Sequence, residues 1–477
     1  MTDERPWAGR RLHFIGIGGA GMSGLAQVAG ALGAAVSGSD RADSALFARL
    51  REDGATVAVG HDAANVPAGD GVEVVYSTAV PPENPERAVA RERGLAELHR
   101  ADLLGEITDL PGRRCIAVTG THGKTTTSSM VVHALRGAGM DPGYLVGGEV
   151  RSTGSNAGWG TGEWVVVEAD ESDRSLLRLH PDVAVLTNAE LDHHATYGSR
   201  LDVDETFRAF LAKASEGIVV WDRPELVALA PSGAAVGASG VAGVGGVAGV
   251  GGAADGGDGG VELAPYDVPE PLLDATGIRF DWRGIAVRLS VPGAHNALNA
   301  AAALEACRLA GADPARAAAA LADFRGAGRR FELLGTTASG ATVYDDYAHH
   351  PTEVAATVAA ARTLAPGRVV VVFQPHLFSR TRALAREFGA ALAAADLVVV
   401  LDVYPARERA EQFPGVDGRL VAAATADAAD GGPRAGVAWL PGFDAAERYL
   451  RSELRAGDLC LAMGAGDVNA LGARLLA

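Results

Sequence analysis

Short apolar runs alternate with helix-like segments along most of the chain. In the first block this pattern predicts strands at residues 11–17, 35–39 and 72–77 and a helix at residues 22–32. Parallel strands are joined by right-handed crossovers, which are usually helices. The alternation therefore predicts a parallel sheet.

Two further blocks repeat the alternation. The second contains predicted strands at residues 114–119, 164–168 and 183–188 and a predicted helix at residues 125–137. The third contains predicted strands at residues 342–345, 368–373, 397–403 and 459–463. Several of these runs are apolar throughout, as expected for strands that are covered on both faces. The predicted fold class is α/β.

The length of 477 residues exceeds what one hydrophobic core supports, so several domains are expected. We place three of them at residues 1–106, 107–325 and 326–477. Within the second, residues 231–260 are almost entirely Gly, Ala, Val and Ser and have no period that would bury one face. We interpret this segment as a flexible surface insertion.

Composition narrows the class of function. The formal net charge of −17 would repel a phosphate backbone over most of the surface, so nucleic acid is not an expected partner. The sequence has no apolar run of membrane-spanning length and no leader-like start, so no membrane partner is expected and the predicted location is the cytoplasm. Cys115, Cys307 and Cys460 lack the spacing of a zinc site and are interpreted as buried thiols.

The strongest local signal is the run Gly-Thr-His-Gly-Lys-Thr-Thr-Thr at residues 120–127, between a predicted strand and a predicted helix. Glycines let backbone amides turn toward phosphate oxygens, and the helix N-terminus adds partial positive charge. We expect Lys124 on the β- and γ-phosphates and the Thr125 hydroxyl on magnesium. Val118 stands where a strict Walker A motif has glycine, so the loop is a shortened variant.

A second Gly-rich turn, Gly-Ile-Gly-Gly-Ala-Gly at residues 16–21, is followed by Asp40 at the end of the next predicted strand. Alone, this motif allows a dinucleotide, another pyrophosphate-containing ligand, or only tight packing. Two nucleotide loops in one chain favour a kinase-like or ligase-like enzyme that takes ATP and a nucleotide-diphosphate substrate.

Acidic and histidine side chains follow two strands of the second block. Glu168, Asp170, Glu171 and Asp173 follow residues 164–167, and such carboxylates suit a magnesium site, although a solvated acidic turn remains the alternative. Asp192, His193 and His194 follow the next strand. No further Cys or His follows at zinc spacing, so a second magnesium position is the simpler interpretation.

Further polar clusters lie at a helix start and at strand ends of the third block. His295, Asn296 and Asn299 open an Ala-rich helix, where Asn296 is also a plausible cap. The third block supplies Arg329 and Arg330, the run Asp-Asp-Tyr-Ala-His-His-Pro at residues 345–351, and Gln374, His376, Arg380 and Arg382. Arginine binds phosphate and carboxylate through paired hydrogen bonds, while a surface ion pair is the alternative for each one.

These motifs, in this order, resemble those of the Mur ligases. The resemblance covers nearly the whole chain outside residues 231–260 and rests on seven motifs: residues 16–24, 120–127, 168–172, 190–194, 295–299, 345–353 and 373–376. The shortened phosphate loop is the usual form in that family.

The resemblance implies an architecture and an activity. The architecture is three domains: a Rossmann-like N-terminal domain for a UDP substrate, a central P-loop ATPase-type domain, and a C-terminal α/β Rossmann-like domain that binds the amino acid and closes on ATP. The activity is ATP-dependent ligation of L-alanine to the carboxylate of UDP-N-acetylmuramate through an acyl phosphate, in peptidoglycan precursor synthesis. ATP and Mg²⁺ are the implied cofactors, and a monomer or homodimer is expected.

The resemblance and the residue patterns together assign a site. The catalytic residues are expected to be Lys124, His349 and Arg380. The expected ATP-binding residues are Gly120, Thr121, His122, Gly123, Lys124, Thr125, Thr126, His295, Asn296, Asn299 and Arg330. The UDP substrate is assigned to Gly16, Gly18, Gly19, Gly21, Met22, Ser23 and Asp40, and the amino acid to Tyr347, His349 and Arg380. The metal ligands implied are Thr125, Glu168 and His193.

Three residues depart from the pattern of the family. Ala348 stands where glycine is usual, Ala195 where an acid often follows, and Leu377 where some members carry arginine.

Several alternatives of role and class stay open. His349 either deprotonates the incoming amine or only positions it. The rival classes are a nicotinamide oxidoreductase, which leaves residues 120–127 unexplained, and a non-catalytic nucleotide-binding regulator. Within the family, the alternative is a recycling ligase that attaches a preformed peptide to the same sugar nucleotide.

Overall fold

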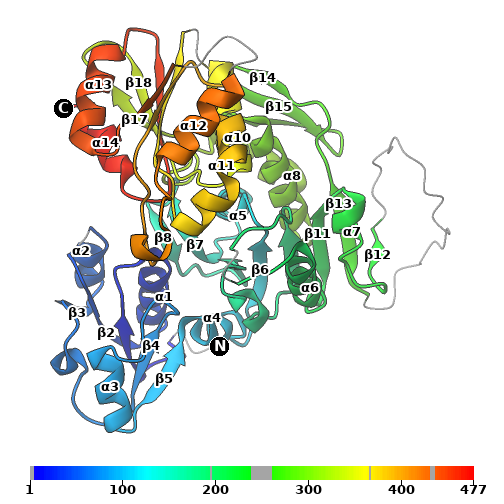
Figure 1. The fold of residues 1–477 in the computed structure, drawn as a ribbon. Coiled ribbons are helices and arrows are strands. Elements are labelled where there is room, and N and C mark those ends of the chain that lie inside the picture. Colours follow the sequence, from blue (N-terminus) through cyan, green and yellow to red (C-terminus); the bar gives the residue numbers. More distant parts are fainter. Residues whose placement is uncertain (1–4, 44, 194–195, 238–259, 365–366, 430–435) are drawn as a thin grey trace. The chain divides into compact units, whose positions relative to one another are not determined.

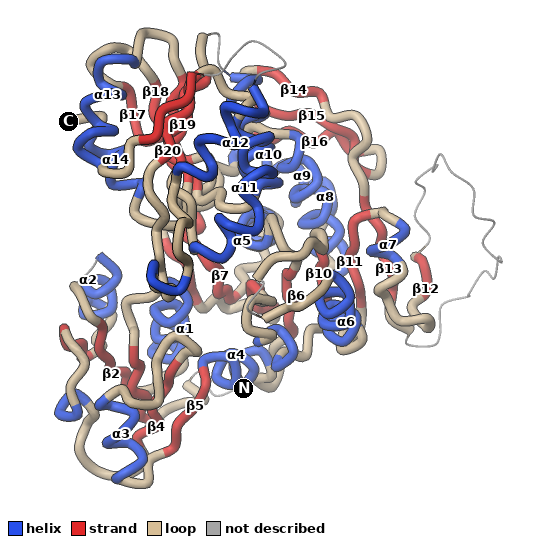
Figure 2. The backbone as a smooth tube through the Cα atoms, viewed as in Figure 1, coloured by secondary structure: helices blue, strands red, loops and turns tan. Residues whose placement is uncertain are grey.

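The computed structural model describes residues 5–43, 45–193, 196–237, 260–364, 367–429 and 436–477. Backbone contacts divide the chain into two units. Figure 1 labels their helices and strands. The first comprises the residues up to Asp267 with Arg283–Ile285 and Asn299–Leu321, and the second comprises Val268–Trp282, Ala286–Leu298 and Ala322–Ala477. Each unit is α/β, as Figure 2 shows by the alternation of helices and strands.

The first unit opens with a five-stranded, all-parallel sheet in the order β3-β2-β1-β4-β5. Its elements are β1 (Arg11–Ile15), α1 (Ala20–Ala31), β2 (Ala35–Asp40), α2 (Ala45–Glu52), β3 (Thr56–Val59), β4 (Val72–Tyr76), α3 (Pro85–Glu92), β5 (Ala96–His99) and α4 (Arg100–Thr108). Side chains alternate between the faces of a strand. Leu12 and Phe14 accordingly pack in the cluster that includes α1, α2 and α4, whereas Ile15 packs in the cluster that includes Ala90 of α3.

The same unit continues with an eight-stranded sheet in the order β12-β13-β11-β10-β6-β9-β7-β8. Its strands are β6 (Arg114–Thr119), β7 (Gly143–Val150), β8 (Ser155–Gly158), β9 (Trp164–Glu168), β10 (Val183–Leu186), β11 (Gly217–Trp221), β12 (Ala235–Val236) and β13 (Glu262–Tyr266). The helices in this stretch are α5 (Lys124–Gly137), η2 (Ser175–Arg178), α6 (Arg200–Leu211) and α7 (Pro224–Val227). Only the β7–β8 pair is antiparallel among the pairs described for this sheet.

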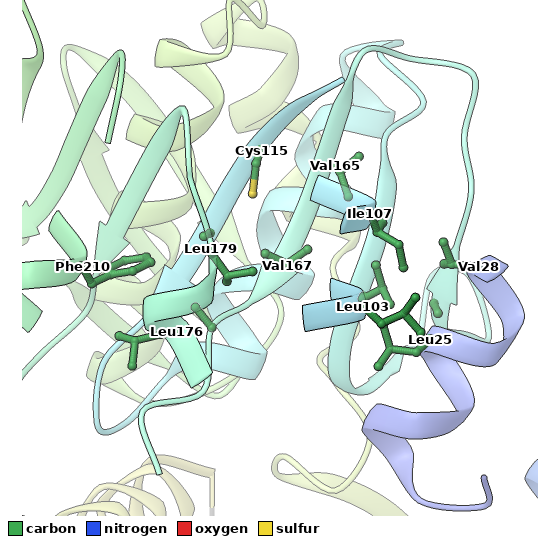
Figure 3. Close-up of a cluster of buried hydrophobic side chains, with 14 of the residues drawn as sticks. Leu25, Val28, Leu103, Ile107, Cys115, Val165, Val167, Leu176, Leu179 and Phe210 are labelled. Atoms are coloured by element: carbon green, nitrogen blue, oxygen red, sulfur yellow. The ribbon is translucent and has the colours of Figure 1, made fainter. Parts of the chain in front are cut away.

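One apolar cluster joins the helices of the first sheet to the second sheet. In Figure 3, Leu25 and Val28 of α1 lie beside Leu103 and Ile107 of α4, and the cluster continues to Val165 and Val167 of β9. Farther along, it includes Cys115, Leu176, Leu179 and Phe210. Each buried side chain of this size contributes about 1.5–3 kcal/mol to folding, so this continuous cluster fixes the two sheets as one unit.

A three-stranded sheet of β14 (Leu272–Asp274), β15 (Gly277–Trp282) and β16 (Ile285–Leu289) precedes the Ala-rich α8 (Ala294–Leu309) and α9 (Pro314–Ala320). The later part of α8 packs in the first unit. There the Cys307 thiol lies 3.8 Å from the carbonyl oxygen of Val131 in α5, and the Trp164 indole donates to the Ala310 carbonyl.

The second unit contains a six-stranded sheet in the order β17-β18-β22-β19-β20-β21, with only β17–β18 antiparallel. Its strands are β17 (Glu332–Thr336), β18 (Thr342–Asp346), β19 (Val369–Phe373), β20 (Leu397–Val400), β21 (Gly436–Trp439) and β22 (Leu459–Met463). The apolar cluster on one face includes α10 (Pro351–Leu364), α11 (Phe378–Leu392) and α12 (Arg419–Ala429). The cluster on the other face includes α13 (Phe443–Glu453) and α14 (Val468–Arg474).

The α/β class and the predicted strands are confirmed. The antiparallel neighbours at the sheet edges were not predicted, because edge strands carry a weaker apolar signal than central ones. The three cysteines are buried, as expected. No helix within the described ranges has the length and apolar character needed to cross a membrane. The three domain ranges stay a prediction, and the proposed boundary at 106/107 falls inside α4.

The segment interpreted as a flexible surface insertion, residues 231–260, begins with a short exposed strand that was not predicted. Ala235 and Val236 form β12, which pairs in parallel with Glu262 and Leu263 of β13. Two residues of alternating small and β-branched type give too short a pattern to be recognised as a strand. Residues 238–259, the larger part of the segment, lie outside the described residues.

A deletion that spares β12 tests the remainder of this segment. Replacing residues 239–258 by a flexible linker of eight Gly and Ser residues should change the free energy of unfolding by less than about 1 kcal/mol, because loop-closure entropy varies slowly with length. Chemical denaturation measures this directly. A deletion that begins at residue 233 and removes β12 serves as the contrast and should cost more, because it removes the ladder to β13.

Candidate active site

The phosphate loop turns between β6 and α5 at two glycines with positive φ. Gly120 has φ of +132°, and a Cβ there would lie 2.1 Å from the Thr187 hydroxyl oxygen. Gly123 is the N-cap of α5 with φ of +82°, and a Cβ there would lie 2.6 Å from Asn299 Oδ1. Both positions therefore require glycine for conformation and for space.

The residues after β10 hold this loop from behind. The Asn188 side chain accepts from the His122 amide at 2.9 Å and donates to the His122 carbonyl at 2.9 Å. The Thr187 hydroxyl donates to the same carbonyl, and the Thr121 hydroxyl donates to the Glu190 carbonyl at 3.1 Å. These bonds occupy the rear of the loop and fix its shape.

Lys124 lies in the loop as a buried cation. Its ammonium donates to the carbonyls of Gly120 at 2.6 Å and Thr121 at 3.2 Å, and it forms an ion pair with Glu171 at 2.7 Å. Burial alone would lower the pKa of Lys124, but the nearby carboxylates, Glu171 first, outweigh it and raise the pKa. The ammonium is therefore charged at neutral pH.

Glu171 is the acid that the structure brings to Lys124. Its side chain is only 3% exposed, and its oxygens lie 2.7 Å from Lys124 Nζ and 3.2 Å from His193 Nε2. Both oxygens are buried. A buried carboxylate is stabilised by positive charge, so this position suits a cation such as the Lys124 ammonium.

The other acids of the cluster have different partners. Glu168, at the end of β9, accepts from the Gly147 amide at 2.8 Å. Asp170 and Asp173 both accept from the Arg100 guanidinium, at 3.1 and 3.2 Å. Burial raises the pKa of Asp170, but Lys124 and Arg100 outweigh it and lower the pKa to about 2. The alternative of a solvated acidic turn is therefore wrong for Glu171, whose side chain is buried.

His193 has a backbone φ of +51°, which is uncommon for a residue with a Cβ. Strained backbone of this kind is concentrated at functional sites. His194 and Ala195 lie outside the described residues. Thr125 and Thr126 are buried in the first turn of α5.

Asn299, on α8, reaches the phosphate loop within the first unit. Its Oδ1 accepts from the Thr127 hydroxyl at 3.3 Å. His295 and Asn296 begin the same helix in the part assigned to the second unit. The Asn296 side-chain Nδ2 donates to the Pro292 carbonyl at 2.6 Å. Burial lowers the pKa of His295 to about 4, so its ring is neutral.

The N-terminal glycine turn lies between β1 and α1. Gly16 has φ of +79°, and Gly19 is the N-cap of α1. Asp40, at the end of β2, accepts from the Gly18 amide at 2.9 Å. Met22 and Ser23 are buried in α1, where the Ser23 hydroxyl donates to the Ala20 carbonyl.

A cavity of about 200 Å³ lies beside this turn, within the first unit. Gly21 and Gly24 line it from α1, Arg100 from α4, and Glu168 and Asp170 from the acidic cluster. A Cβ on Gly21 would lie 3.4 Å from Arg100 Nη1. The cavity therefore extends from the glycine turn to the acids that follow β9.

In the second unit, Asp345 in β18 and Glu353 in α10 bind two neighbouring arginines. Arg329 donates to Asp345 at 3.0 Å, and Arg330 donates to Glu353 at 3.5 Å. Asp346 accepts from the amides of Phe331 and Ala348, and burial raises the pKa of Asp346 to about 6. Arg329 and Phe331 have positive φ, at 57° and 50°.

Aromatic rings and Arg380 form the other half of this cluster. The His349 ring lies 5.2 Å from the Tyr347 ring and 5.8 Å from the His376 ring. Arg380 Nη1 lies 3.2 Å from His376 Nδ1, and the residue is only 3% exposed. Tyr347 and His349 from one motif and Arg380 from another thus belong to one side-chain group. Arg382 lies elsewhere, over the Phe413 ring.

Several residues that shape the site were missed from the sequence. Thr187 and Asn188 hold the phosphate loop, Glu171 pairs with Lys124, and Arg100 binds two of the acids. Glu171 was noted as an acid at a strand end, but nothing in the sequence distinguished it from the neighbouring acids. Arg100 carried no signal, because it lies 70 residues from Asp170 in the chain.

Three family models match the chain: "Mur ligase family, catalytic domain" at residues 11–110, "Mur ligase middle domain" at residues 118–231, and "Mur ligase, glutamate ligase domain" at residues 329–466. Curated relatives named UDP-N-acetylmuramate–L-alanine ligase come from Mycobacterium sp. strain JLS and Thermobifida fusca. Each is 45% identical to this chain, covering 98% of it and 95% or 96% of the relative.

Solved structures agree with this result. The crystal structure of UDP-N-acetylmuramate-alanine ligase from Thermotoga maritima matches with a TM-score of 0.77 and 27% identity, over 98% of both chains. A murein peptide ligase from Psychrobacter arcticus shares the fold, with a TM-score of 0.67 and 24% identity over 98% of both chains. On the strength of these matches along its length, the chain belongs to the Mur ligase family.

Proposed function

We propose that this protein joins L-alanine to the carboxylate of UDP-N-acetylmuramate and converts ATP to ADP and phosphate. The observation that carries the proposal is the 45% identity, over 98% of the chain, to relatives that bear the name of this reaction. The phosphate loop with its buried Lys124 supports the use of ATP. Folylpolyglutamate synthase and another ligase with the same fold have been solved with adenine nucleotides.

The chemistry requires activation of the carboxylate, because hydroxide is too poor a leaving group for an amine to displace. A carboxylate oxygen of the sugar nucleotide attacks the γ-phosphorus, the bond to the bridging oxygen breaks, and ADP leaves. The alanine amine then attacks the acyl carbon, loses a proton, and expels phosphate. The charged Lys124 ammonium would stabilise the negative charge that builds on the phosphoryl oxygens in the first step.

The residues present fit a magnesium ion beside the phosphates. Mg²⁺ prefers carboxylate and hydroxyl oxygens together with phosphate oxygens. Glu171 offers buried oxygens beside Lys124 and His193, and Glu168 and the Thr125 hydroxyl come from the neighbouring strand end and helix start. With His193, these residues would hold the ion. When bound, it would neutralise phosphate charge and orient the γ-phosphate.

The glycine turn at residues 16–21 is proposed to bind the pyrophosphate of the UDP moiety at the start of α1. The cavity beside Arg100 leads from that turn toward the acids after β9. It therefore offers a path for the sugar and its carboxylate toward the phosphate loop. The Arg100 guanidinium, which lines this cavity near Gly21, would attract the anionic substrate.

The alanine is proposed to bind at the group formed by Tyr347, His349 and Arg380. A guanidinium holds a carboxylate through two parallel hydrogen bonds, which leaves the amine free to react. The His349 Nδ1 lies 2.9 Å from the Tyr347 carbonyl and 3.3 Å from Glu353, so these groups orient the ring. Its role as base or as positioning group stays a prediction, as do the cytoplasmic location and the oligomeric state.

Phosphate release with ATP and UDP-N-acetylmuramate, measured against a panel of amino acids and the preformed peptide, tests the proposal. L-Alanine should stimulate release most strongly. Stimulation by the peptide alone would indicate the recycling ligase, and absorbance changes at 340 nm with NAD would indicate an oxidoreductase. No amino-acid-dependent release at all would favour a regulator.

Replacement of Lys124 by alanine should lower kcat at least about 100-fold, because the ammonium stabilises charge in the transition state. Lys213→Ala is the matched control, since that ammonium contacts only the Leu177 carbonyl among the described residues and lies in the same unit. Circular dichroism checks that both variants are folded. Activity of Lys124→Ala within tenfold of wild type would contradict the assignment of the phosphate loop.

Arg380→Ala tests the amino-acid site. We expect the KM for alanine to rise about 10- to 100-fold, which corresponds to about 1.4–2.8 kcal/mol, in keeping with the loss of a charged hydrogen bond. The KM values for ATP and UDP-N-acetylmuramate should change little. The control is Arg382→Ala, whose exposed guanidinium lies over Phe413. The opposite result, in which Arg382→Ala raises the alanine KM and Arg380→Ala leaves it unchanged, would contradict the assignment of Arg380 to the amino-acid site.

A further inference from the structure

A second buried carboxylate, Glu86 of α3, joins four segments of the N-terminal sheet. Its side chain is fully buried. Oε2 accepts from the Ser39 hydroxyl of β2 at 2.6 Å and lies 3.4 Å from His13 Nε2 of β1. Oε1 accepts from the Asn65 side chain at 2.8 Å and from the Asp62 amide at 3.2 Å. None of these groups belongs to the phosphate loop or its acids.

Glu86 is ionised and can therefore only accept hydrogen bonds. Burial would raise the pKa of Glu86, but the hydrogen bonds from His13, Ser39 and Asn65 outweigh it, and the pKa is lowered. The one hydroxyl proton of Ser39 is thus committed to Glu86. The Ser39 oxygen must then accept from its other neighbour, the His61 ring, whose Nδ1 lies 2.9 Å away. A neutral His61 consequently carries its proton on Nδ1 and presents Nε2 as an acceptor.

His61 lies near the glycine turn that is proposed to bind the pyrophosphate, on the side where the nucleobase would lie. The amide of Gly60 donates to the Asp40 carbonyl at 2.7 Å, and Asp40 in turn accepts from the Gly18 amide of the glycine turn. The ring is therefore at the carboxyl ends of β2 and β3, the edge at which parallel sheets bind nucleotides. Its side chain is 19% exposed, and Nε2 has no hydrogen-bond partner among the described residues.

We propose that Glu86 is a positioning residue that acts through Ser39 to fix His61 as an acceptor for the N3–H of uracil. Uracil carries a proton on N3, whereas cytosine has a lone pair there, so an acceptor at this position selects uridine over cytidine nucleotides. This inference rests on the proposed function, in which the N-terminal sheet binds a UDP substrate. The three residues form the Glu86–Ser39–His61 relay.

Glu86→Gln should reverse the relay rather than merely weaken it. The Asp62 amide and the Asn65 side chain both donate to the Oε1 position, and the Asn65 orientation is fixed because its Nδ2 also donates to the Gly60 carbonyl at 2.9 Å. The glutamine carbonyl must therefore occupy that position. Its NH₂ group then faces Ser39 and donates to it, the Ser39 proton turns to His61 Nδ1, and Nε2 becomes a donor.

Binding of UDP and CDP to the full-length protein, measured by calorimetry, tests this reversal. Wild type should prefer UDP. Glu86→Gln should raise the Kd for UDP about tenfold or more, because an Nε2–H donor would then face the N3–H donor of uracil and at least one hydrogen bond would be lost. The UDP-over-CDP preference should fall by at least the same factor. The Kd for ADP should not change. Nitrogen-15 shifts of labelled histidine should move the His61 proton from Nδ1 to Nε2, a change that a purely structural role would not produce.

Glu73→Gln is the matched control. Glu73 lies in β4 of the same sheet and binds Arg10 at 2.7 Å, away from the relay, so its amide variant should keep the wild-type preference. If Glu86→Gln does not fold, the partly exposed His61→Ala serves instead and should lose the preference. Wild type that fails to bind UDP would overturn the proposed function. Wild type that binds UDP, with an unchanged preference and tautomer in Glu86→Gln or an unchanged preference in His61→Ala, would overturn the relay alone.

Discussion

The buried ion pair between Lys124 and Glu171 is the interaction on which the candidate site depends. Removing two charges from water costs several kcal/mol each, and their attraction repays this only with close geometry and additional polar partners. Here the ammonium also donates to two loop carbonyls, and the loop can present those carbonyls because Gly120 and Gly123 adopt positive φ. The two glycines, Lys124 and Glu171 therefore act together, and none of them alone would stabilise a buried ammonium in this loop.

Both hydrogen bonds and apolar packing support the phosphate loop and its ion pair. Thr187 and Asn188 bind the backbone groups of His122 at the rear of the loop, and these hydrogen bonds fix the shape of the loop. The apolar cluster of α1, α4 and β9 joins the first sheet to the second. Arg100 lies at the start of α4, and this packing brings it against Asp170 and Asp173. A position set by core packing thereby controls the electrostatics of the cavity beside the glycine turn.

The same principle recurs in each of the three mainly parallel sheets. Parallel strands end at a common edge, and their polar continuations gather there. In the first sheet these are the glycine turn, Asp40 and His61, supported by Glu86. In the eight-stranded sheet they are the phosphate loop and the acids, and in the six-stranded sheet they are the arginines and rings around Asp346. Buried carboxylates have three different states at these edges: Glu86 is saturated with donors, Glu171 forms ion pairs, and burial raises the pKa of Asp346.

The sequence by itself determined the α/β class, the central strands, both glycine turns and the residue types of the site. These features are local, because apolar runs, glycines and a following lysine act over a few neighbouring residues. The tertiary structure decided which acid pairs with Lys124, that Arg100 reaches Asp170, and that Met22 and Ser23 are buried. It also decided that Glu86 orients His61, and it made Ala235 and Val236 an edge strand. Those outcomes depend on contacts between residues far apart in the chain, where packing and desolvation select one polar partner among several that are equivalent in sequence.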